Sequence, residues 1–193
     1  MTRIAVERAL PTQLSTEPIQ AWRAWGLAGR RDGTNLQLRP VAGRSRSWPP
    51  DRPAEAVCKL GWFHEAPHAE CTCGLHGTHG PDLLRRTRSP AVLGRVAMWG
   101  RVIEHELGYR GRFGYPQRIR LVCQFCFWQW GATGPAPEPT LVGWFPRDEL
   151  VPMCDVHVEI AHRYGMRPRA LLDGPEVDQA LRATYRVDPL PAS

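Results

Sequence analysis

The strongest pattern along this chain is the alternation over residues 92–103, where every second position places an apolar or small side chain on one face. A period of two is typical of a β-strand. A turn at Leu107-Gly108 leads into a second alternating stretch, so the pattern predicts an antiparallel ribbon. Further strands are predicted at 21–27, 35–39, 109–115 and 119–122.

Two apolar, aromatic runs at 127–130 and 141–145 lie on either side of a proline-containing loop and predict a second hairpin. Helices are predicted at 81–86, 152–164 and 173–185. The first and last of these carry a proline near their start, which suits the first helical turn. The middle one has apolar side chains spaced by four, as expected for one face of a helix.

The six cysteines fall into two groups of three, and the second group has the more specific spacing. Cys123-x2-Cys126 is followed, after twenty-seven residues, by Cys154-x2-His157. Pairs separated by two residues can direct both donors to one ion, and three thiolates with one imidazole form the tetrahedral set that Zn²⁺ prefers. Four protein donors leave no position for water, so the spacing predicts a structural zinc ion.

The first group consists of Cys58 and the pair Cys71-x-Cys73, and it predicts a second structural zinc ion. The histidines near enough in sequence to supply the fourth donor are His64, His68, His76 and His79. A Cys-x-Cys pair has a narrow bite and takes its other donors from a separate segment. This favours the more distant His64, with the other three histidines left open.

Three disulfides are the alternative use of six cysteines, and they require an oxidising compartment. Met1 is followed by no basic region and no apolar run suited to export, so we expect a cytoplasmic protein. No stretch approaches eighteen apolar residues, so no membrane span is expected. Prolines interrupt residues 1–20, which we expect to form a flexible leader.

Composition suits a protein of short elements, because nineteen prolines and eighteen glycines divide the 193 residues. The net charge of +6 is uneven, since nineteen of the twenty-five basic residues lie in 1–122 and the rest of the chain is acidic. All basic residues except Lys59 are arginine. Guanidinium groups bind phosphate well, which favours a nucleic-acid partner. The alternative is that the arginine bias follows from GC-rich coding.

Three motifs within 21–122 are similar to a family of small bacterial, mostly actinobacterial, zinc-finger-like proteins. They are His64-Glu-Ala-Pro, Cys71-Thr-Cys-Gly-Leu, and the stretch 94–110 with its Trp-Gly-x-Val-x-Glu-His-x-x-Gly-Tyr-Arg pattern. The resemblance implies kinship rather than an activity. It favours His64 as the fourth ligand, because a histidine before Ala-Pro recurs in the family. Where the family often continues Cys-Gly-Ile-Tyr-Ala, this chain has Cys-Gly-Leu-His-Gly-Thr-His, which keeps the two later histidines in competition.

The polar and aromatic residues around the end of that stretch form a candidate binding site. The set is Trp99, Arg101, Glu104, His105, Tyr109, Arg110 and Arg112. A glutamate beside His105 could orient its imidazole, and Arg110 could bind a phosphate or carboxylate. The alternative is a plain hairpin whose arginines and glutamates pair across strands, with the aromatic residues in the core.

These features predict an α+β fold with a leader at 1–20, a small antiparallel β-sheet domain at 21–122 and a second zinc module at 123–193. A cysteine knuckle, a hairpin and a ligand pair at the start of a helix make that module, which ends in helices, similar to a treble clef. No Walker, GxGxxG, HExxH or GxSxG motif occurs. The sequence therefore favours a non-enzymatic zinc-binding protein that engages nucleic acid or another protein. The alternative is a small-ligand reader or enzyme with a pocket at Glu104, His105 and Arg110.

Overall fold

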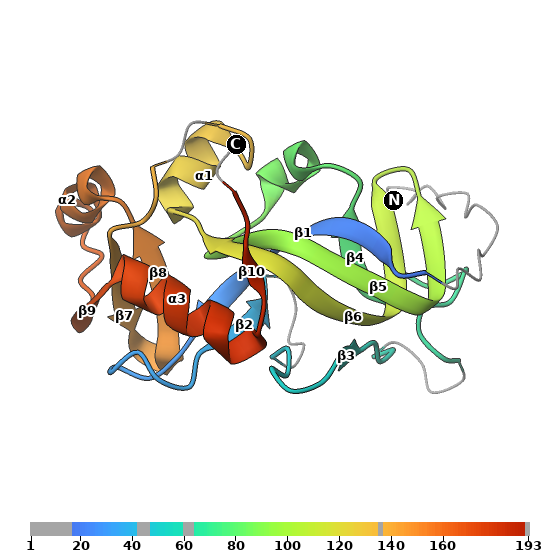
Figure 1. Cartoon of the computed structure of the whole chain (residues 1–193). Coiled ribbons are helices and arrows are strands. Elements are labelled where there is room, and N and C mark those ends of the chain that lie inside the picture. The colour runs from blue at the N-terminus through green and yellow to red at the C-terminus, as the bar shows by residue number, and fades with distance from the viewer. Residues whose placement is uncertain (1–16, 42–46, 60–63, 135–136, 192–193) are drawn as a thin grey trace.

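A computed structural model describes residues 17–41, 47–59, 64–134 and 137–191. These residues form an α+β fold around a ten-stranded sheet (Figure 1). The strands are β1 (Ile19–Ala28), β2 (Gln37–Pro40), β3 (Ala54–Glu55), β4 (Leu75–Thr78), β5 (Val92–His105), β6 (Gly108–Leu121), β7 (Leu141–Phe145), β8 (Glu149–Met153), β9 (Ala170–Asp173) and β10 (Asp188–Pro189). The helices are α1 (Gln124–Trp130), α2 (Asp155–Arg163) and α3 (Gly174–Tyr185), with 3-10 helices η1 (Pro81–Arg86) and η2 (Pro146–Asp148).

The long antiparallel ribbon of β5 and β6 lies at the centre of the sheet, and β1 pairs with the other edge of β5. The predicted ribbon is therefore confirmed. The two strands predicted at 109–115 and 119–122 are one continuous strand. The strand continues through Pro116, which lies where the register between β5 and β6 shifts. A proline is tolerated at such an irregularity, where its missing N–H breaks no regular ladder.

Side chains on the two faces of the sheet form separate apolar clusters. One face buries Trp25 of β1 together with Tyr185 of α3, both fully buried. The opposite face packs Leu93 of β5 against Phe127 of α1 and Leu84 of η1. Successive side chains of a strand point to opposite faces, so the central strands contribute to both clusters. The sheet thus lies between α3 on one side and α1 with η1 on the other (Figure 1).

Strand β1 connects the early and late parts of the chain. Its C-terminal end pairs with β2 and also with β8, where Leu27 lies opposite Leu150. The buried cluster that contains Trp25 includes residues from both sides of residue 122, such as Leu38 and Leu181. The division into domains at 122 stays a prediction, while sheet and core are continuous across it.

The hairpin predicted from 127–130 and 141–145 is wrong in its first strand. The first run lies in α1, and β7 pairs instead with β8. Aromatic residues favour strands locally. Here a helical turn after Cys123 brings Cys126 back beside it and buries Phe127 against the sheet. Since a helix follows the cysteine knuckle, the treble-clef similarity is not confirmed.

The remaining predicted elements are confirmed with shifted ends. Strand β1 starts at Ile19, within the expected leader, whose residues 1–16 lie outside the described residues. Helix α2 starts at Asp155 rather than at 152, because the preceding residues belong to β8. The helix predicted at 81–86 is a 3-10 helix. None of the described helices has the length and apolar character needed to cross a membrane.

Candidate metal centres

The downstream group brings four donor atoms within 4.8 Å of one another: those of Cys123, Cys126, Cys154 and His157. The Nδ1 atom of His157 lies 3.1 Å from the sulfur of Cys154, 3.3 Å from that of Cys126 and 3.5 Å from that of Cys123. The sulfurs of Cys126 and Cys154 are 3.8 Å apart. A tetrahedral ion with ordinary Zn–S and Zn–N bonds holds its sulfurs about 3.8 Å apart and its nitrogen about 3.6 Å from each sulfur. The group therefore fits a Cys3His metal site.

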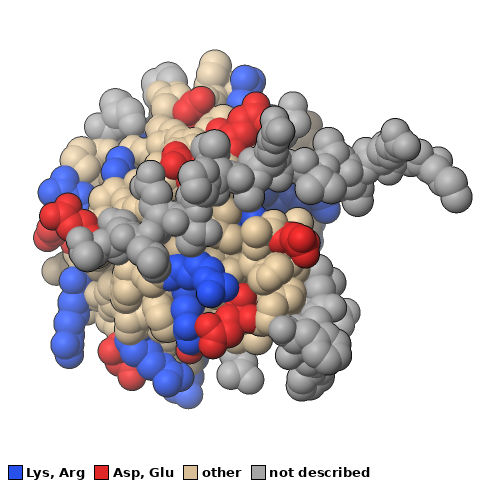
Figure 2. Space-filling model, turned by 90° about the vertical axis from the view of Figure 1, so that its right-hand side faces the viewer, with Lys and Arg blue, Asp and Glu red and all other residues tan. Residues whose placement is uncertain are grey.

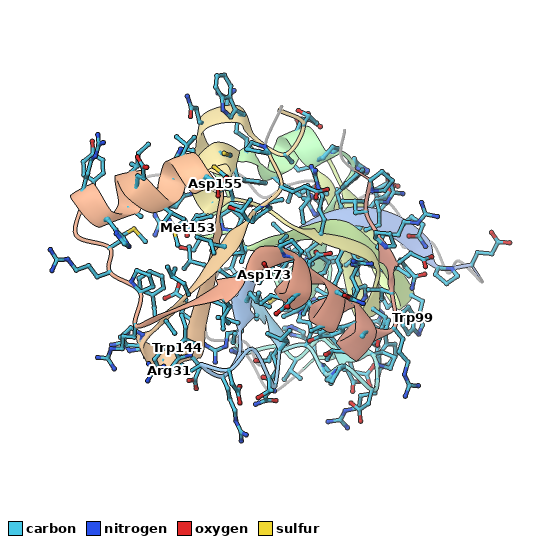
Figure 3. All side chains as sticks on the ribbon, turned by 60° about the vertical axis from the view of Figure 1, so that its left-hand side comes forward. Arg31, Trp99, Trp144, Met153, Asp155 and Asp173 are labelled. Atoms are coloured by element: carbon cyan, nitrogen blue, oxygen red, sulfur yellow. The ribbon has the colours of Figure 1, made fainter. Side chains whose placement is uncertain are left out.

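Each ligand pair of this group lies at the start of a helix. Cys123 precedes α1, and its carbonyl accepts the N–H of Phe127 at 2.9 Å. Cys154 precedes α2, and its carbonyl accepts the N–H of His157 at 2.9 Å. One helical turn separates the donors of each pair, so a two-residue spacer places both on the same side. Figure 3 labels Met153 and Asp155, the two residues that flank Cys154 where β8 leads into α2.

Protein atoms enclose the downstream group. Its three cysteines are buried, and the ring of Phe125 stacks on the His157 imidazole with 5.3 Å between centroids and 18° between planes. Burial raises the pKa of the Cys123 and Cys126 thiols. Without a metal these thiols are neutral at pH 7, so a bound cation must displace their protons.

The upstream group also brings four donors within 4.8 Å of one another, from Cys58, His64, Cys71 and Cys73. The sulfurs of Cys58 and Cys71 are 3.8 Å apart, and His64 Nε2 lies 3.4 Å from the Cys73 sulfur. Both separations fit a tetrahedral site of the same kind. All four residues are half-buried. Burial, together with Cys71, raises the pKa of Cys73 to about 11.

The structure places the other candidate histidines differently. His76 Nε2 lies 3.0 Å from the carbonyl oxygen of Thr72, and His79 Nε2 lies 3.0 Å from that of His105. The ring of His68 packs on that of His64, with centroids 4.6 Å apart. Among these four described histidines, His64 is the one grouped with the three thiols.

Arg110 of β6 holds the backbone of the upstream loop. Its Nη1 donates to the carbonyl of Cys71 and, at 3.2 Å, to that of His68. Gly74, which follows the cysteine pair, has φ of 134°, and a Cβ there would lie 3.0 Å from the Cβ of Arg110 and 3.2 Å from that of Pro67. A glycine is required by both the backbone conformation and the close packing. This explains the glycine of the Cys-x-Cys-Gly motif.

Three other residues of the candidate binding set surround His79 rather than Arg110. His79 Nε2 lies 3.7 Å from a carboxylate oxygen of Glu104 and contacts the carbonyl of His105. The His79 ring meets that of Tyr109 edge to face at 4.6 Å. Burial and the charge of Glu104 raise the pKa of Tyr109. The predicted set is thus divided between this cluster and the metal loop.

The rest of the set lies along the ribbon near its turn. Arg112 forms ion pairs with Glu65 at 3.0 Å and Glu55 at 3.4 Å. Trp99 is half-buried and Arg101 is exposed. Figure 2, which shows this end of the molecule, has basic and acidic side chains intermixed. Of the three arginines in the predicted set, Arg110 and Arg112 therefore already have partners within the protein.

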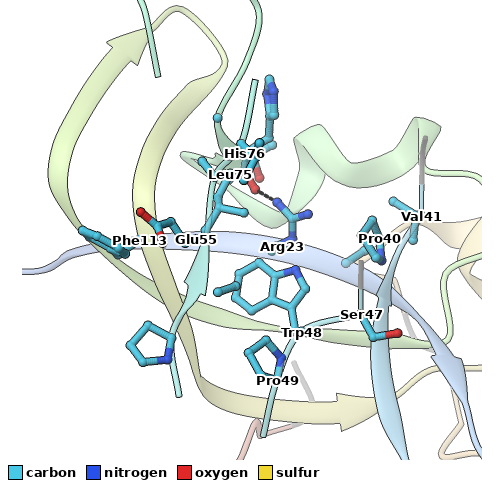
Figure 4. A pocket seen from close by; sticks show the side chains of 18 of the residues that line it. Arg23, Pro40, Val41, Ser47, Trp48, Pro49, Glu55, Leu75, His76 and Phe113 are labelled. Carbon is cyan, nitrogen blue, oxygen red and sulfur yellow. Dashed lines mark hydrogen bonds between the residues drawn. The ribbon is translucent and has the colours of Figure 1, made fainter. Parts of the chain in front are cut away.

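Sequence reasoning missed a cleft of about 870 Å³ that contains Arg23 and Trp48 (Figure 4). The signal was present in the alternation of β1, because Arg23 is the charged residue on a face otherwise made of Ala21, Trp25 and Leu27. The residues of the predicted pocket, Glu104, His105 and Arg110, are not among the described residues that line this cleft.

A second missed feature is an arginine pair on the opposite face of the sheet. Arg95 of β5 lies directly across from Arg118 of β6. The Arg95 guanidinium carbon is 5.0 Å from the ring centroid of Trp22, a cation–π contact. These residues line a hollow of about 470 Å³. Neither arginine forms an ion pair with a carboxylate in the described parts of the chain.

No protein-family model, curated protein or solved structure matches this chain. The family resemblance suggested by 21–122 therefore stays an expectation. Fold and sites define an α+β protein with two Cys3His groups that could each hold a metal ion.

Proposed function

We propose that this chain is a structural-zinc protein that binds single-stranded nucleic acid in the hollow lined by Trp22, Arg95 and Arg118 on one face of its sheet. Zinc is the metal best suited to three thiolates and one imidazole in a tetrahedral set. Because the protein supplies all four donors in each group, no coordination position is left for water or substrate. Both ions therefore stabilise the fold and take no part in a reaction.

The two centres connect segments that are separated in the sequence. The upstream group ties Cys58 and His64 to the cysteine pair just before β4, and the downstream group ties the end of β6 to the start of α2. Metal binding of this kind contributes directly to folding free energy. Short elements that bury little apolar surface gain most from it.

One observation carries the proposal for nucleic acid: Arg95 and Arg118, which form no ion pair among the described residues, lie directly opposite one another beside a partly exposed Trp22. Like charges in opposing strand positions destabilise a sheet. A bound phosphate chain offsets this repulsion and neutralises both guanidinium groups. Trp22 offers a ring on which a base can stack.

Helix α1 borders this face and adds further aromatic surface. Phe127 of α1 packs into the same cluster as Trp22. Trp128 and Trp130 of the same helix are 49% and 50% exposed. Stacking of unpaired bases on exposed aromatic rings is tolerant of sequence and requires single strands. We therefore expect single-stranded RNA or DNA to bind better than a duplex.

Fluorescence anisotropy of a labelled oligonucleotide with the zinc-loaded protein tests the proposal. We expect single-strand affinity to fall steeply as salt rises from about 50 to about 200 mM. The double substitution Arg95→Gln/Arg118→Gln should reduce the slope of log K against log salt by about 1.4, which corresponds to two lost phosphate contacts. The control Arg167→Gln/Arg169→Gln removes the same charge from exposed positions before β9. Equal effects of both pairs, or no binding at low salt, would exclude this surface.

A further inference from the structure

The cleft that contains Arg23 opens at a gap in the sheet. On this edge β1 pairs with β4 at Trp22 and with β2 from Trp25 onward. Between these points, no described strand pairs with Arg23 and Ala24 on this edge. The cleft of about 870 Å³ extends from this gap toward Trp48 and β4. Its size is within the range of small-molecule sites, about 300 to 1,000 Å³.

Arg23 is held in this cleft with part of its bonding capacity unused. Its Nη1 donates to the carbonyl of His76, as the dashed line in Figure 4 shows. The guanidinium carbon lies 5.0 Å from the ring centroid of Trp48 and 5.9 Å from that of Trp25. Its Nε is buried and has no hydrogen-bond partner among the described residues. In the described parts of the chain Nη2 makes no hydrogen bond, which leaves its two N–H groups for a ligand.

Within the part of the chain that the structure describes, the charge of Arg23 has no acidic partner, since no carboxylate there lies within ion-pair distance of it. Burial lowers the pKa of Arg23 to about 10, so the group stays protonated at pH 7. A buried charge without a counter-ion is unfavourable, and an anion that reaches it regains the lost interaction energy. The electrostatics of the cleft therefore favour an anionic occupant.

The remaining walls of the cleft are largely apolar. Trp48 lies beneath the guanidinium, with Leu75 on one side and Pro40 on the other (Figure 4). Arg52 and Lys59 add positive charges to the lining, and Glu55 a negative one. We propose that this cleft binds a small organic anion whose acidic group contacts Arg23 Nη2 and whose apolar ring packs between the partly exposed Leu75 and Pro40. The cleft shares Trp22 with the hollow beside Arg95 and Arg118, but Arg23 itself points to the opposite face of β1.

A pair of fluorescent probes separates the charge from the apolar body. We would titrate the zinc-loaded protein with 8-anilinonaphthalene-1-sulfonate and with N-phenyl-1-naphthylamine, which has the same rings without the sulfonate. The sulfonate should bind more tightly. Arg23→Gln should weaken its binding tenfold or more, since a hydrogen bond to a charged group contributes about 1.5 to 3 kcal/mol, and should leave the neutral probe unchanged. Arg31→Gln, at an exposed turn position after β1, should alter neither.

Equal weakening of both probes by Arg23→Gln, or unchanged sulfonate binding, would overturn the proposal. If Arg23→Gln fails to fold by circular dichroism, hydrogen–deuterium exchange of the wild-type protein decides. The sulfonate should then protect β4 and residues 47–55 from exchange. Protection confined to other segments, or none at all, would refute the site.

Discussion

Replacing Arg110 by methionine tests whether this residue positions the upstream metal loop. Methionine keeps most of the apolar stem but removes the Nη1 donor that holds the carbonyls of His68 and Cys71. A hydrogen bond from a charged donor contributes about 1.5 to 3 kcal/mol. Because Arg110 is half-buried, we expect each of its two hydrogen bonds to contribute an amount near the low end of this range. We therefore expect about 2 to 3 kcal/mol less stabilisation of the loop, or about 30- to 150-fold weaker zinc binding at this centre.

The protein is titrated with a zinc chelator, and native mass spectrometry at each step counts the zinc ions that remain bound. In Arg110→Met one ion should leave at a lower chelator concentration than in the wild type, while the second should be retained as before. Arg112→Met is the matched control, because exposed ion pairs such as those with Glu55 and Glu65 contribute about 0 to 1 kcal/mol. Identical chelator midpoints for Arg110→Met and the wild type would refute the positioning role. If Arg110→Met weakened zinc binding equally at both centres, the inference that Arg110 acts on the upstream loop alone would be refuted.

Three further outcomes are expected. His64→Ala should lower the zinc content from two ions to one by native mass spectrometry, whereas His76→Ala should leave it at two. Cys126→Ser should unfold the region after β6 and expose its amides to hydrogen exchange, since a structural zinc ion contributes more than 10 kcal/mol, about the whole stability of a small domain. Tyr185→Phe should lower the free energy of unfolding in urea by about 2 to 4 kcal/mol, because the buried hydroxyl serves two backbone groups, at 2.7 and 2.9 Å. Unchanged values in any of these measurements would contradict the corresponding contact.

Metal-donor residues were accessible to sequence reasoning because their chemistry depends on residue type and short spacing. Cys123 and Cys126 converge through one helical turn, which a two-residue spacer already encodes. The form of that turn was not accessible, since the aromatic residues around Phe127 favour a strand locally and only packing against Leu93 selects the helix. The hydrogen bonds of Arg110 could not be predicted either. Their acceptors are backbone carbonyls, which every residue type carries.

The structure also suggests why the two metal groups lie where they do. Strand β4 begins two residues after Cys73, and the carbonyl of His76 within it orients Arg23. A metal ion at the upstream group would therefore fix one wall of the Arg23 cleft as well as its own loop. A metal ion at the downstream group would fix the first turn of α1, the helix whose Phe127 packs in the same cluster as Trp22 and whose Trp128 and Trp130 are exposed. On this view each ion has a separate consequence: upstream metal loss should affect the small-anion site first, and downstream loss the nucleic-acid surface.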